Sequence, residues 1–106
     1  MTITVVNLRK QKADFKCDRS SPLGNPFYMR SEHERHTVCN QYETLFQKYL
    51  NPDLAPVGWL EYLDKILQAA KEKDITLGCW CAPKRCHCDT IKTYLEVELN
   101  ADIGKS

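Results

Sequence analysis

Two short apolar runs, one near each end of the chain, constrain the fold most. Residues 2–8, TITVVNL, are β-branched and apolar with almost no polar interruption, which is typical of a strand covered on both faces. Residues 75–81, ITLGCWC, predict a second strand. Because helical sequence separates the two runs, we expect parallel pairing through a right-handed crossover. The sequence therefore predicts an α/β fold, a small mainly parallel sheet flanked by helices in a Rossmann-like layered sandwich.

Apolar residues at helical spacing and local start and stop signals define the other elements. Ser31 or Thr37 is expected to begin a first helix, which Asn51-Pro52 ends. Asp89 is expected to be the N-cap of the last helix. The predicted elements are a long loop over 9–30 with a short strand near Phe15, and helices over 31–50, 59–70 and 89–99.

Length and composition indicate one soluble domain covering residues 1–106. The chain is 42% hydrophobic and 27% charged, its formal net charge is +1, and it has no apolar run of the about 20 residues that a membrane helix needs. The opening MTITVVNLRK has its charges after the apolar residues, the reverse of a secretory signal. We therefore expect a cytoplasmic protein, without a membrane partner. Its six cysteines are then expected to be thiols or metal ligands.

The stretch CWCAPKRCHC, residues 79–88, carries four of the six cysteines and one of the three histidines. Alternation along a strand puts Cys79 and Cys81 on one face and Trp80 on the other. Cys86 and His87 follow a short turn and stand just before the last predicted helix. The unpaired N–H groups at that helix start favour anions and lower the pKa of a nearby thiol. Soft ligands from two elements are thus expected to converge.

This convergence allows a metal site. Cys79, Cys81, Cys86 and either His87 or Cys88 supply four groups of the kind that tetrahedral zinc binds, although their spacing differs from the paired C-x-x-C of zinc ribbons. Zinc is therefore the candidate cofactor.

The same residues allow two further interpretations. Cys79, Cys86 and His87 are candidate catalytic residues in a reactive-thiol site, where Lys84 and Arg85 add positive charge for an anionic ligand. A thiol pair that responds to oxidant is a further alternative. The simplest interpretation is that the cysteines are small buried hydrophobic residues.

A second candidate binding segment is the loop SSPLGNPF, residues 20–27. Gly24 permits a close approach of backbone to a ligand, and Ser21 and Asn25 are able to hydrogen-bond to backbone or ligand. These three residues, with Lys84 and Arg85, are the candidate ligand-binding residues. The loop is expected to form the wall opposite residues 79–88.

The two motifs together resemble a known family. GNPF at 24–27, a helix that carries Tyr42, and LGCWCAPKRCHCD at 77–89 resemble domain-of-unknown-function family 4326 of microbes and phages, over residues 3–99. The family pattern CWC-x-P-x-x-CH-x-D has a small residue, often glycine, where Cys88 stands. The resemblance therefore sets Cys88 aside and keeps Cys79, Cys81, Cys86 and His87 as the metal ligands. If the chain is encoded by a phage, its location is the host cytoplasm.

Two functions follow as expectations. The leading one is binding, with or without processing, of a phosphate-bearing small molecule such as a nucleotide. The ligand is expected in a pocket between residues 20–27, the GNPF loop, and residues 79–88, the CWC/CH loop. The alternative is a zinc-stabilised module without catalysis, whose partner is a host protein or nucleic acid. The residues alone do not decide whether the chain is an enzyme.

Overall fold

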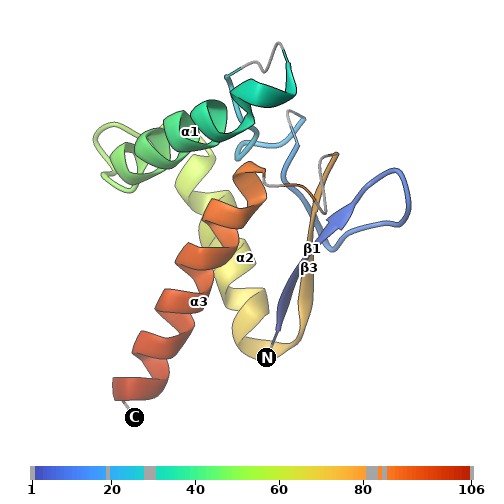
Figure 1. Ribbon diagram of the computed structural model, residues 1–106. Helices are drawn as coiled ribbons and strands as arrows, with labels where there is room; N and C mark the ends of the chain where they lie inside the picture. Colours follow the sequence, from blue (N-terminus) through green and yellow to red (C-terminus); the bar gives the residue numbers. More distant parts are fainter. Residues whose placement is uncertain (1, 19, 28–30, 81–83, 85, 106) are drawn as a thin grey trace.

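The computed structural model of the protein describes residues 2–18, 20–27, 31–80, 84 and 86–105 (Figure 1). Its elements in chain order are β1 (Ile3–Asn7), β2 (Phe15–Lys16), the 3₁₀ turn η1 (Glu32–Glu34), α1 (Arg35–Tyr49), α2 (Trp59–Glu72), β3 (Ile75–Cys79) and α3 (His87–Lys105). The two long strands and three helices lie where the apolar patterns predict them. Ser31 is the N-cap of η1, and α3 begins two residues before the predicted cap Asp89.

The three strands form one parallel sheet in the order β1-β3-β2. The last strand in the sequence is therefore the central one. Ile3 pairs with Ile75 at one end of the β1–β3 ladder, and Asn7 pairs with Cys79 at the other. On the opposite side of β3, Phe15 pairs with Leu77. The predicted α/β fold with a parallel sheet packed against helices is confirmed.

The two faces of the sheet are covered differently. Figure 1 shows the three helices on one side of β1 and β3, and the segment that leaves β1 loops out on the other side. Leu8 and Ala13 from this segment approach the backbone of Gly78 in the middle of β3. Glycine is required at this position because no space remains for a side chain.

Replacement of Gly78 by alanine is expected to destabilise the protein. The new Cβ atom would lie 2.5 Å from Leu8 Cδ2 and 2.8 Å from Ala13 Cβ, so the covering segment must move. Overpacking of this kind costs about 1–3 kcal/mol of unfolding free energy, which urea denaturation would measure. Val57→Ala, at a fully exposed site, is the control and should change stability by less than about 0.5 kcal/mol. Equal stability of the two variants would contradict the close approach.

Aromatic rings join the helices over the sheet. Phe46 of α1 is 1% exposed, and its ring centroid lies 5.1 Å from that of Trp59 and 5.4 Å from that of Tyr94. These edge-to-face contacts link α1 to α2 and α3. Ile91 and Leu95 on α3 are fully buried against the same core. The packing of α3 directs its first turn toward the end of β3, where the candidate site lies.

Candidate metal centre

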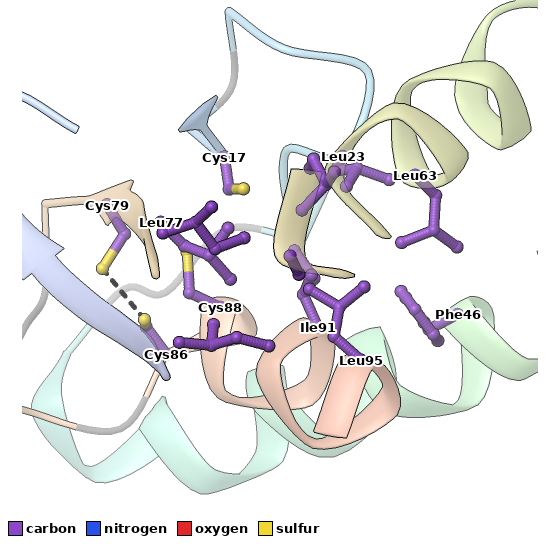
Figure 2. Close-up of a cluster of buried hydrophobic side chains, with 14 of the residues drawn as sticks. Cys17, Leu23, Phe46, Leu63, Leu77, Cys79, Cys86, Cys88, Ile91 and Leu95 are labelled. Carbon is purple, nitrogen blue, oxygen red and sulfur yellow. Dashed lines mark hydrogen bonds between the residues drawn. The ribbon is translucent and has the colours of Figure 1, made fainter. Parts of the chain in front are cut away.

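Three cysteine thiols meet between the end of β3 and the start of α3. The sulfur atoms of Cys79, Cys86 and Cys88 all lie within 4.8 Å of one another, and those of Cys79 and Cys86 are 3.0 Å apart (Figure 2). Cys79 and Cys88 are fully buried, and Cys86 is 4% exposed. All three thiols are free of disulfide bonds. Among the described residues, this is the cluster able to provide three metal ligands.

Local structure explains why these thiols converge. Alternation along β3 turns Cys79 toward the core, while the next residue, Trp80, is 51% exposed, as the strand pattern predicts. Cys86 immediately precedes α3, and its N–H donates to Asp89 Oδ2 at 3.2 Å. Asp89 therefore caps the helix from its first turn, through the side-chain half of a capping box, and not from the N-cap position. Because α3 begins at His87, Cys88 lies on the helix and faces the sheet.

His87 lies beside the thiols but is engaged with the backbone of another segment. Its Nε2 atom contacts the carbonyl oxygen of Cys17, and since a carbonyl only accepts, Nε2 carries the proton. The imidazole also packs edge-on against Tyr42, with 5.1 Å between ring centroids. Nε2 is 4.0 Å from the sulfur of Cys88. Within the described part of the chain, the close group of ligand atoms contains Cys88 and not His87.

Burial and thiol contacts raise the pKa of two of the three thiols, Cys86 and Cys88. The hydrogen bond with Cys79, together with burial, raises the pKa of the Cys86 thiol. The pKa of Cys88 is raised by hydrogen bonds with the thiols of Cys17, Cys79 and Cys86 and by burial. A thiol with a raised pKa is a weak nucleophile at neutral pH, since the thiolate is the reactive form. The neutral thiols are therefore weak nucleophiles, and a metal ion would have to displace their protons to bind.

The three described loop residues expected to bind ligand make hydrogen bonds within the loop. Ser21 Oγ donates to the carbonyl of Asp18 at 2.8 Å, and the N–H of Gly24 donates to the carbonyl of Ser21 at 3.1 Å. Asn25, 8% exposed, accepts the N–H of Phe27 on its side-chain oxygen at 2.8 Å. These bonds give the polar residues of the GNPF loop a structural role as turn residues.

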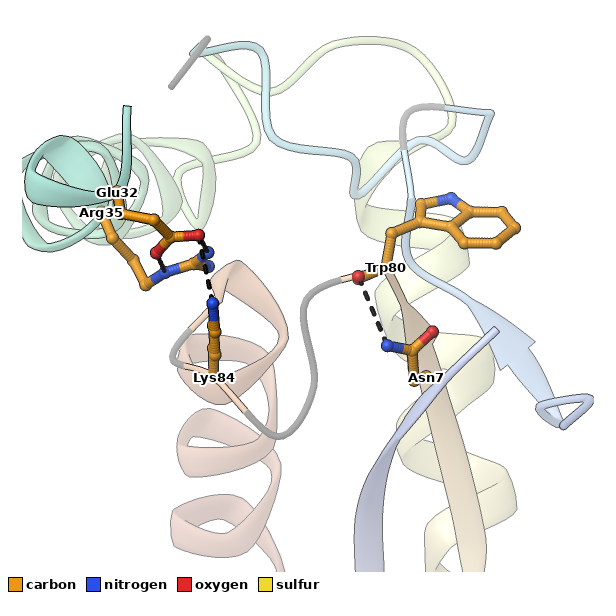
Figure 3. A network of polar contacts seen from close by, with 5 residues as sticks. All are labelled: Asn7, Glu32, Arg35, Trp80 and Lys84. Atoms are coloured by element: carbon orange, nitrogen blue, oxygen red, sulfur yellow. Dashed lines mark hydrogen bonds and ion pairs between the residues drawn. The ribbon is translucent and has the colours of Figure 1, made fainter. Parts of the chain in front are cut away.

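Lys84, the described basic residue of the segment 79–88 that was expected to bind an anion, is paired with an acid. Lys84 Nζ lies 3.3 Å from Glu32 Oε1, and Arg35 Nη2 lies 2.8 Å from the same oxygen atom, so both form ion pairs with Glu32 (Figure 3). Hydrogen bonds from Arg35 and then Lys84 lower the pKa of Glu32 to about 2. The same view shows Asn7 donating to the carbonyl of Trp80. The other predicted residues of this segment, Cys81 and Arg85, lie outside the described residues.

A pocket borders the GNPF loop on the side of α1 and α2. Its volume is about 160 Å³, and Tyr42 fixes the loop beside it by donating from its hydroxyl to the Leu23 carbonyl at 2.8 Å. The lining residues are apolar or aromatic: Pro22, Gly24, Pro26, Tyr42, Leu45, Phe46, Tyr49, Pro56 and Trp59. Gly24 thus lines a pocket whose other walls include residues of α1 and α2, and none of the described residues of 79–88 is among its lining residues.

Two buried thiols at or near the site are absent from the final set of predicted ligands. Cys88 was an alternative to His87 until the family pattern set it aside, and Cys17 is more than sixty residues from Cys79 in the sequence. The N–H of Cys17 donates to the Gly78 carbonyl at 2.8 Å, which extends the pairing of β2 with β3 by one residue. The signal for Cys17 is its spacing: it follows Phe15 by two residues, as Cys79 follows the paired Leu77.

Comparison with known proteins identifies the family. No curated protein and no solved structure matches the chain. Among the described residues, no helix is both long and apolar enough to cross a membrane. The model of domain-of-unknown-function family 4326 (DUF4326) matches residues 5–97, which include the paired strands, the GNPF loop and the cysteine cluster. The chain therefore belongs to the DUF4326 family.

Proposed function

We propose that the protein is a zinc-stabilised interaction domain without a reaction of its own, in which Cys79, Cys86 and Cys88 hold the metal. The observation that carries this proposal is the meeting of three buried thiols from two elements within 4.8 Å. Zinc binds thiolate sulfur at about 2.3 Å, so two sulfurs of a tetrahedral site lie about 3.8 Å apart. The Cys79 and Cys86 sulfurs need to separate by only about 0.8 Å to reach this geometry.

The third thiol favours zinc over a disulfide. A disulfide between Cys79 and Cys86 would require their sulfurs to approach by about 1 Å, a movement of similar size. It would leave the buried Cys88 thiol without a role. A metal ion engages all three thiols, and it joins the end of the central strand to the start of α3. Thiol-rich sets of this kind select zinc among the common divalent ions.

Burial of the ligands supports a structural site. Catalytic zinc keeps one position open to water or substrate, whereas structural zinc is enclosed by protein ligands. At most 4% of any of the three cysteines is exposed. Trp80, which follows Cys79 directly in the sequence, is exposed, and its indole N–H donates to Asp18 Oδ2 at 3.2 Å. A fixed, exposed aromatic ring suits contact with a protein partner, and the carboxylate beside it disfavours nucleic acid.

Metal content tests this function. Protein purified without chelator should contain one equivalent of zinc by inductively coupled plasma mass spectrometry. In its native state, the three ligand thiols should react with a thiol reagent only after chelator is added, because coordination shields them. Metal-free protein would overturn the proposal. So would a Cys79–Cys86 disulfide found by peptide mass spectrometry.

A second candidate function is binding of a nucleotide-like small molecule in the pocket beside the GNPF loop. The observation in its favour is the set of aromatic and proline side chains around Gly24, since planar heterocycles pack well on such rings. Trp59 lines this pocket and is 3% exposed. Trp80→Phe leaves Trp59 as the one tryptophan of the chain. Its fluorescence should change saturably with a nucleotide, and no change with any nucleoside mono-, di- or triphosphate would exclude this pocket.

A further inference from the structure

We propose that Cys17 is the fourth zinc ligand, so that Cys17, Cys79, Cys86 and Cys88 form a closed tetrathiolate site, an inference that rests on the zinc function proposed above. This assignment replaces a histidine with a cysteine that lies more than sixty residues away in the sequence. It also extends the site from β3 and α3 to β2 and the GNPF loop.

The strand register places Cys17 beside Cys79. Phe15 pairs with Leu77, and the N–H of Cys17 continues the ladder by donating to the Gly78 carbonyl at 2.8 Å. Side chains two residues apart on a strand share a face, and paired residues on neighbouring strands lie about 4.8 Å apart. Cys17 therefore stands opposite Cys79 on the face that carries Phe15 and Leu77. That face is the one covered by α3.

Cys88 connects Cys17 to the other two thiols. The sulfur of Cys88 is 3.9 Å from the Gly78 carbonyl, next to the position where Cys17 joins the ladder. The Cys17 thiol contributes to the raised pKa of Cys88, and both residues are fully buried. Figure 2 shows the Cys88 sulfur between Cys17 and the Cys79–Cys86 pair. Cys17 Sγ makes a weak 3.9 Å contact to the Phe15 carbonyl and lies outside the group of three sulfurs that are within 4.8 Å of one another, so coordination requires the Cys17 side chain to rotate toward the metal.

The surroundings suit a site of four thiolates. Binding breaks four S–H bonds, releases four protons to solvent and leaves a net charge of −2 on the zinc and its ligands. The positive end of α3 begins at His87, between two of the ligands, and favours this charge. The His87 imidazole holds the carbonyl of Cys17, so it orients a ligand segment as outer partners of metal sites do.

Coordination by Cys17 would make the rigidity of the GNPF loop depend on bound metal. Cys17 lies three residues before the start of that loop at Ser20, and β2 itself is only two residues long. The loop carries Gly24, which lines the aromatic pocket, and Leu23, which is bound by Tyr42. Removal of zinc should therefore loosen residues 20–27 and increase their amide hydrogen exchange.

The chain offers a direct test, because it has six cysteines and the proposal uses four. In the double variant Cys39→Ser, Cys81→Ser, the four proposed ligands are the only cysteines that remain. X-ray absorption at the zinc edge should give four sulfurs at about 2.3 Å in this variant, as in the native protein. Three sulfurs and one light atom would overturn the assignment of Cys17 and leave the zinc function standing. Metal-free native protein would overturn both.

The single variant Cys17→Ser gives the complementary measurement. It should retain three sulfurs, and its zinc affinity should fall by more than the about 10–100-fold that loss of an outer partner costs. Cys81→Ser and His87→Gln are matched controls that should keep four sulfurs. If Cys81→Ser loses a sulfur while Cys17→Ser keeps all four, the proposal is wrong. If Cys17→Ser does not fold, the double variant still decides the ligand set.

Discussion

The Cys86→Ser protein should purify without stoichiometric zinc, and its midpoint of thermal unfolding should fall by about 15 °C or more. Zinc that binds only the folded chain contributes about 4 kcal/mol when its free concentration is about 1,000 times the dissociation constant. In a domain of about 100 residues, each kcal/mol corresponds to at least about 4 °C. Differential scanning calorimetry with parallel metal analysis measures both effects. The native protein treated with chelator should behave like the variant.

Cys39→Ser is a matched control for this substitution. Cys39 is buried to the same extent as Cys86, 4% exposed, but lies on α1 and outside the thiol cluster. The Cys39→Ser substitution also removes one buried sulfur atom, but it leaves the proposed ligands intact. The control should therefore keep one equivalent of zinc and retain its response to chelator. Equal destabilisation of both variants, with no effect of chelator on the native protein, would show that the thiols act only through packing.

Phe46→Ala should lower the free energy of unfolding by about 3–5 kcal/mol. The Phe46 ring is 1% exposed and contacts Trp59 on α2 and Tyr94 on α3, so its removal leaves a cavity where all three helices meet. Small domains have a total free energy of unfolding of about 5–15 kcal/mol. Because the predicted loss is a large part of this, a measurable fraction of the variant should be unfolded at 37 °C. The shift of the urea midpoint, followed by circular dichroism, measures the loss.

A surface leucine provides the comparison for Phe46. Leu54 is 49% exposed in the connector between α1 and α2, and Leu54→Ala should change stability by less than about 0.5 kcal/mol. Phe46→Leu keeps much of the apolar volume, so its loss of unfolding free energy should lie between those of Phe46→Ala and Leu54→Ala. A loss below about 1 kcal/mol in Phe46→Ala would contradict the packing of the three helices around this ring.

Apolar periodicity was sufficient to predict the main elements of the fold. ITVVN and ITLGC are strands, and the three segments with apolar residues at helical spacing are helices, because burial of a face or stripe repeats with the period of the element. Less regular signals were weaker guides. The start of α3 was predicted at Asp89 because aspartate is a common N-cap, yet the same side chain also suits the third helical position, where it accepts the N–H of Cys86.

Cys88 was named as an alternative ligand and then set aside because of the family pattern, and the predicted start of α3 gave no geometric reason to keep it. A predicted start at Asp89 leaves residues 86–88 in a loop of undefined direction, whereas a helix from His87 turns Cys88 toward the sheet. Cys17 was missed for another reason: only the register of a two-residue strand places it beside Cys79. Ser21 and Asn25 form hydrogen bonds within their own turns, and their role as ligand-binding residues stays a prediction.

The order β1-β3-β2 also has a consequence for synthesis of the chain. β1 and β2 emerge first, but each is hydrogen-bonded to β3 and not to the other. Both edge strands therefore lack a partner until residues 75–79 have been synthesised and have left the ribosome. Non-local pairing of this kind slows folding, because long loops must close before any ladder forms. A nascent chain that stalls before Ile75 would expose two unpaired strands, and the sheet would assemble in one late step around its last strand.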